Sequence, residues 1–164
     1  MTTRTVSGGP RATVAAHGLR VALPPRWEAR LFLRDGLGAG WDGESVNPVL
    51  HLANFALPTG RGDFGSGAVE LMGSRHAFVS LLEYDATEAG QPLFAARGMP
   101  RPALDEFAPN ALQRRLPGQL GCQRFFTENG RAFCLYVVLG SRTEAAGLVS
   151  DVHGVLDNLT VELR

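Results

Sequence analysis

The chain has 164 residues, 45% of them apolar, which suffices for a globular domain with a buried core and argues against disorder. All 16 basic residues are arginines, and they balance 16 acidic residues to a formal net charge of zero. The arginines are spread evenly along the chain, whereas a nucleic-acid-binding protein gathers its basic residues in a stripe. We therefore expect no nucleic-acid partner.

Residues 1–10 are polar and lack the hydrophobic core of an export signal. No apolar run approaches the roughly 20 residues that span a bilayer. We expect no membrane insertion, a cytoplasmic location, a flexible tail over residues 1–12 and one domain over residues 13–164.

Apolar patterning predicts the elements of the first two thirds of the chain. It predicts strands over residues 17–23, 28–34, 49–57 and 77–84. Four glycines predict a loop over residues 35–47, and an irregular stretch over residues 85–102 precedes a short helix over roughly residues 109–115.

The strongest local signal is Asn129-Gly130, which lies between two apolar runs. This dipeptide favours a type I′ hairpin turn, because both central residues need a positive φ. A two-residue turn fixes the register, and it places Glu128 opposite Arg131, Phe126 opposite Phe133, Phe125 opposite Cys134, and Cys122 opposite Val137.

This register bears on the two cysteines of the chain. It places Cys122 and Cys134 on opposite faces of the hairpin, where they cannot form a disulfide with each other. We expect two buried thiols, which fit a reducing compartment.

Helical spacing of apolar residues predicts a C-terminal helix that contains Leu148, Val152 and Val155. Ser141 or Thr143 can cap its start, and a short strand over residues 160–163 follows. A strand–helix–strand unit of this kind is most often parallel.

Together these elements predict an α+β fold, in which a mostly antiparallel sheet of about six to seven strands carries one long C-terminal helix and one or two short helices. Both faces of the hairpin are apolar. One face carries Phe126, Phe133, Leu135 and Val137, and the other carries Phe125, Cys134, Tyr136 and Val138. Either the middle of the chain covers the second face, or that face is a partner surface.

A glycine-rich loop offers a second kind of site. Gly60, Arg61, Gly62, Asp63 and Gly65 match the G-x-G-x-x-G pattern of dinucleotide-binding loops. The following segment is short and broken by glycine, and Asp63 would place a negative charge beside a pyrophosphate. A small-ligand or nucleotide site over residues 59–67 is therefore the alternative to protein binding.

Catalytic and metal-binding patterns give no further candidate. The four histidines are dispersed without metal-ligand spacing, and no base is placed beside a cysteine nucleophile. We expect no enzyme, no catalytic residue, no metal and no cofactor; an enzyme assembled from scattered residues is the third alternative.

Several segments resemble the PsbP-like α/β/α sandwich, and the chain also resembles small proteins of high-GC actinobacteria. The segments are the proline-ended strand before Trp27, the strand over residues 78–84, Gly130-Arg131-Ala132-Phe133, and the helix end Val155-Leu156-Asp157-Asn158-Leu159. Domains of this superfamily are generally non-catalytic accessory subunits, adaptors for other proteins or regulators of a small GTPase. The resemblance implies a non-catalytic protein-binding or adaptor module, with self-association as one form of it.

Overall fold

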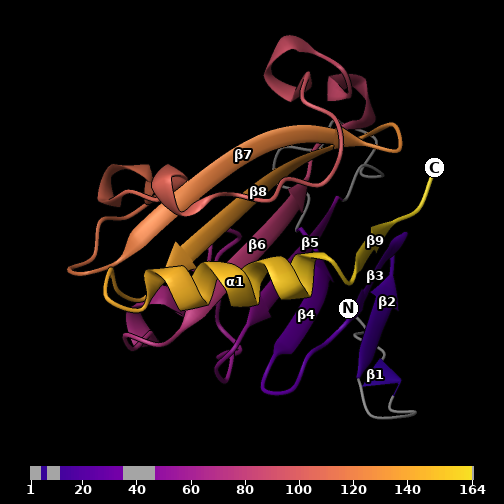
Figure 1. Ribbon diagram of the computed structural model, residues 1–164. Coiled ribbons are helices and arrows are strands. Elements are labelled where there is room, and N and C mark those ends of the chain that lie inside the picture. The colour runs from indigo at the N-terminus through magenta and orange to yellow at the C-terminus, as the bar shows by residue number, and fades with distance from the viewer. Residues whose placement is uncertain (1–4, 7–11, 35–46, 164) are drawn as a thin grey trace.

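The computed structural model describes residues 5–6, 12–34 and 47–163. Its strands form a four-stranded and a five-stranded sheet, both antiparallel (Figure 1). The four-stranded sheet has the order β1 (Thr5–Val6), β2 (Thr13–Ala16), β3 (Leu19–Ala22) and β9 (Leu159–Val161). The five-stranded sheet has the order β4 (Glu28–Leu33), β5 (Pro48–Ala53), β6 (Ala77–Glu83), β8 (Arg131–Leu139) and β7 (Leu120–Glu128).

The α+β class is confirmed, and the strands divide between two sheets where one was expected. The strand predicted over residues 17–23 is confirmed as β3, although its first two residues form a turn. β3 pairs with β2, a strand that was not predicted, in a hairpin that turns at His17-Gly18 with φ values of 52° and 75°. Residues 5–6 pair with β2, so part of the predicted tail is an edge strand. The loop predicted over residues 35–47 lies outside the described residues except for Asn47.

The register predicted for the β7–β8 hairpin is confirmed. Glu128 faces Arg131, Phe125 faces Cys134, and Asn129 and Gly130 have φ values of 49° and 74°. The prediction succeeded because the turn residues alone determine how the two strands pair.

The C-terminal helix α1 spans Ala145–Leu156, and the Ser141 hydroxyl just before it accepts a hydrogen bond from the Glu144 amide at 3.2 Å. Among the described residues no helix is long and apolar enough to cross a membrane. The strand after α1 is not parallel to β8, because β8 already has β6 and β7 as neighbours. β9 pairs antiparallel with β3 instead.

The short helix predicted over residues 109–115 is only the 3-10 turn η5 (Pro109–Ala111). The chain becomes extended at Leu112, and the next amide, of Gln113, donates a hydrogen bond to the Tyr136 hydroxyl at 2.8 Å. The Gln113 amide therefore bonds to a side chain of the sheet and not to a backbone carbonyl of a second helical turn.

The main core lies between the five-stranded sheet and a layer made of α1 and the four-stranded sheet (Figure 1). Leu50, Leu81 and Val137 of the large sheet pack there with Val152 of α1 and Val21 of β3. One hydrophobic core therefore joins both sheets and the helix.

The opposite face of the five-stranded sheet carries the predicted partner surface, which comprises Phe125, Cys134, Tyr136 and Val138. Cys134, Tyr136 and Val138 are buried, and Phe125 is half-buried. Tyr136 and Val138 pack in one cluster with Phe64 and Leu112, which come from irregular segments. The chain itself covers this face, so the alternative expectation of a partner surface at these residues is wrong.

Both cysteines should resist thiol reagents in the folded protein. Cys122 and Cys134 are free and buried, and burial raises the pKa of Cys122 to about 11 and also raises the pKa of Cys134. A chromogenic disulfide reagent at pH 8 should report no rapid reaction natively and two thiols in guanidinium, because the thiolate is the reactive form. Rapid reaction of either thiol with the folded chain would contradict this burial.

Candidate functional site

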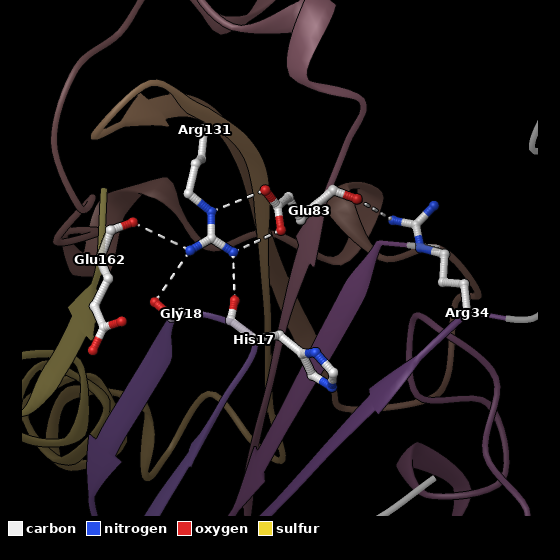
Figure 2. A network of polar contacts seen from close by, with 6 residues as sticks. All are labelled: His17, Gly18, Arg34, Glu83, Arg131 and Glu162. Carbon is white, nitrogen blue, oxygen red and sulfur yellow. Dashed lines mark hydrogen bonds and ion pairs between the residues drawn. The ribbon is translucent and has the colours of Figure 1, made fainter. Parts of the chain in front are cut away.

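The most deeply buried charged group is the Arg131 guanidinium, which pairs with Glu83 across β8 and β6 (Figure 2). Nε and Nη2 donate to the two carboxylate oxygens of Glu83 at 2.9 and 2.8 Å. Nη2 also donates to the His17 carbonyl, and Nη1 donates to the Gly18 and Glu162 carbonyls at 3.1 and 3.2 Å. All five N–H groups of the guanidinium thus have an acceptor.

This network joins the two sheets rather than forming a reaction site. Its carbonyl acceptors belong to the β2–β3 turn and to the residue after β9, and the Glu162 amide donates to the Gly18 carbonyl at 2.8 Å. A Cβ at Gly18 would lie 2.3 Å from Arg131 Nη1, and the φ of Gly18 is +75°, so only glycine fits at this position. The side chains of Arg131 and Glu83 are each 1% exposed.

The loop over residues 59–67 does not form a dinucleotide-binding unit. The flanking strands β5 and β6 are antiparallel, whereas that unit needs parallel strands with a helix between them. The Gly62 and Gly65 amides donate to carbonyls inside the loop, and the Gly67 amide donates to Glu70. These three amides are not available to cradle a phosphate.

The absence of a side chain at Gly65 allows this loop to pack closely against the five-stranded sheet. A Cβ at Gly65 would lie 2.4 Å from the Phe78 ring, and φ there is +88°. Ala68 and Val69 follow in the buried cluster beneath, and only the 3-10 turn η1 (Val69–Leu71) stands where a crossover helix would be.

The side chain of His51, on β5, holds this loop against the five-stranded sheet through two hydrogen bonds. Its Nδ1 accepts a hydrogen bond from Arg61 Nε at 3.0 Å, which leaves the proton on Nε2 to donate to the Asp63 carbonyl at 2.8 Å. The Ser80 hydroxyl donates to the same carbonyl at 2.6 Å. Burial lowers the His51 pKa to about 4, so the imidazole is neutral at pH 7 and both its nitrogens are engaged.

The remaining predicted loop residues are also held by the fold. Arg61 donates to the Pro58 carbonyl, and the Asp63 carboxylate lies 3.6 Å from Arg34. Gly60 has open space where a Cβ would be. No group of three or more His, Cys, Asp or Glu side chains in the described ranges could hold a metal ion.

A surface groove lies between the 3-10 turn η4 (Leu104–Glu106), the segment before β7 and the start of α1. We call it the η4–α1 groove. It consists of two hollows of about 660 and 620 Å³ that share Leu120 and Arg142. Leu104, Phe107 and Ala145 line the first hollow together with the acidic Asp105, and Arg115 lines the second.

The groove has an apolar end and a basic end. Leu104 is 46% exposed beside the buried Phe107 and Leu120. Arg115 and Arg142 are exposed and form no ion pair with the described residues. No acidic side chain lines the basic end.

Sequence reasoning did not identify this groove. Leu104, Arg115 and Arg142 belong to segments far apart in the chain, and no periodic pattern connects them. The only signal was the four prolines of residues 100–118, which predict irregular structure but not its shape.

Comparisons with protein-family models, with curated proteins and with solved structures find no match to the chain. The resemblance to the PsbP-like superfamily stays a prediction.

Replacement of either partner in the Arg131–Glu83 pair should strongly destabilise the fold. Arg131→Met or Glu83→Gln should lower the free energy of unfolding by about 3–5 kcal/mol in urea titrations, because the other charge remains buried without its partner. The double variant Arg131→Met/Glu83→Leu should lose less than the sum of the two. A loss below about 1 kcal/mol for both single variants would show that the network does not hold the sheets together.

His51 should make the stability depend on pH. Its folded pKa of about 4 lies below the ordinary 6.5, so the unfolded chain binds the proton more readily between these values. The free energy of unfolding should fall by about 3 kcal/mol as the pH drops from 6.5 to 4, and His51→Gln should lack this component. Parallel pH profiles for the two proteins would contradict it.

Proposed function

We propose that the chain is a non-catalytic protein-binding module of the adaptor kind, and that its partner binds in the η4–α1 groove. The observation that carries this proposal is the pairing of an exposed leucine with two arginines along one groove. A groove of this composition fits a partner segment better than it fits a reacting small molecule.

The apolar end supports an anchoring contact. Leu104 stays half exposed although its neighbours Phe107, Leu120 and Ala145 are buried. An apolar side chain placed in this hollow would cover Leu104 and complete the burial. Such central apolar contacts carry most of the affinity of protein interfaces.

The basic end supports a choice of partner. Arg115 and Arg142 line the same hollow, which has no acidic lining residue; the acidic Asp105 lines the other hollow of the groove. An acidic side chain of the partner would pair with either guanidinium, and charge complementarity of this kind selects partners and speeds encounter. The partner segment we propose combines an apolar anchor with acidic residues beside it.

The buried polar groups support a role without catalysis. The side-chain nitrogens of Arg131 and His51 form hydrogen bonds within the fold, so these two side chains stabilise the structure. The free and buried cysteines fit the cytoplasm, and we propose that location for the module.

Capture from a lysate of the native host tests the groove when it is done with matched variants. Wild type, Leu93→Ser and Arg20→Glu/Arg97→Glu should recover the same protein, because these residues are exposed on other parts of the surface. Leu104→Ser and Arg115→Glu/Arg142→Glu should recover it at least about tenfold less, and calorimetry with the purified partner should show the same loss of affinity.

Two results would contradict the proposal. If the groove variants and the control variants capture equal amounts of the partner, the interface lies elsewhere. If no protein is captured and light scattering shows a monomer, the proposal of a protein partner is contradicted. A dimer that Leu104→Ser dissociates would identify a second copy of the chain as the partner.

A further inference from the structure

A second hollow, of about 630 Å³, lies between the turn Pro24–Trp27 and the outer face of α1. We call it the Trp27 cleft. It is independent of the η4–α1 groove, with which it shares no lining residue. Its volume lies in the range of small-molecule sites.

Arg26, at the rim of this cleft, has a backbone conformation that its residue type disfavours. Its φ is +73°, and the Trp27 amide donates to the Pro24 carbonyl at 3.2 Å. The hydrogen bond and the positive φ at the third residue are those of a type II turn, in which glycine or asparagine is preferred at that position. An arginine there lowers the stability of the fold.

The other described non-glycine residues with positive φ have a local reason for it. His17 and Asn129 are followed by Gly18 and Gly130 in two-residue hairpin turns, which require positive φ at both central positions. Arg26 lies outside the hairpins, and the type II turn that gives it a positive φ would be unstrained with glycine at this position. Its side chain is exposed, and no ion pair or side-chain hydrogen bond to a described residue offsets the strain. Strain of this sort occurs at ligand sites.

The helix wall of the cleft carries the opposite charge. Asp151 is exposed on α1 and has no ion pair within the described residues, whereas Glu144 pairs with Arg75 at 3.7 Å. Gly147 and Gly154 lie on the same wall with open space where a Cβ would be. A ligand can therefore approach the helix backbone closely beside Asp151.

Trp27 lies between the two charged walls. It is half-buried and packs against the main core, so its indole is held in place while part of it lines the cleft. Rigid aromatic surfaces of this kind bind apolar groups at low entropic cost.

We propose that the Trp27 cleft binds a small zwitterion of about dipeptide size that carries an apolar side chain. The ligand carboxylate pairs with Arg26, its ammonium pairs with Asp151, and its apolar group lies on Trp27. Arg75 and Glu144 also line the cleft, but they pair with each other at 3.7 Å, which leaves Arg26 and Asp151 for the charged ends of the ligand.

Calorimetry on the unmodified chain tests this with glycylphenylalanine as the probe. Saturable binding should weaken at least about tenfold for the N-acetylated peptide and for the C-terminal amide, because each lacks one charge. In a Trp41→Phe variant Trp27 is the remaining tryptophan, and its fluorescence should change with the same binding curve.

Two variants separate recognition from folding. Arg26→Gly should weaken binding at least about tenfold while the Tm stays equal or rises by about 2 °C, because glycine removes the strain. Asp151→Asn should weaken binding of the zwitterion to a similar extent. The controls Arg20→Ala and Leu104→Ser lie outside the cleft and should leave the affinity unchanged.

The proposal is overturned if no saturable binding occurs up to about 10 mM peptide. It is also overturned if the three peptides bind equally, or if Arg26→Gly and Asp151→Asn bind as the wild type does. Because Leu104→Ser affects only the η4–α1 groove, failure here and failure of the proposed protein-binding function are distinguishable.

Discussion

The fold depends on one buried ion pair, between Arg131 and Glu83. Removing a guanidinium and a carboxylate from water costs several kcal/mol per ion, and their attraction offsets this cost only where every donor finds an acceptor. Here the five N–H groups reach five oxygens from the β6 carboxylate, the β2–β3 turn and the chain after β9. Lysine offers three donors from a single nitrogen and could not reproduce this fork. The pair therefore determines where the small sheet sits on the large one, and its position requires a residue without Cβ at Gly18.

The rest of the architecture follows from that placement. With β9 held beside β3, α1 must cross the five-stranded sheet, and the two together cover one face of it. The other face is left to irregular chain, which packs Phe64 and Leu112 over Tyr136 and meets its backbone hydrogen bonds through short turns. Short turns also line the η4–α1 groove, at Leu104, and the Trp27 cleft, at Arg26. Regular strands supply the rigidity, and the irregular segments supply the shape of the surface.

Local chemistry explains how far the sequence alone could be interpreted. Asn129-Gly130 determined the register of the longest hairpin, because the information lies within two residues. The direction of β9 was not predictable in this way, since it depends on β8 having both neighbours already. The same holds for the burial of Cys134, Tyr136 and Val138, whose cover comes from loops distant in sequence. His51 was visible in the sequence only as a strand residue; its contact with Arg61 and Asp63 depends on how the glycine loop folds back.

Two arginines break general rules of protein structure, and the difference between them bears on function. Arg131 breaks the rule that charges remain exposed, and the fold compensates it with five hydrogen bonds and the Glu83 carboxylate. Arg26 breaks the rule that a positive φ belongs to glycine or asparagine, and no ion pair or side-chain hydrogen bond within the described residues compensates it. A departure that is compensated within the fold is explained by stability. For Arg26 the ligand that we propose for the cleft would supply the compensation, because Trp27 and Asp151 line the same hollow with complementary chemistry.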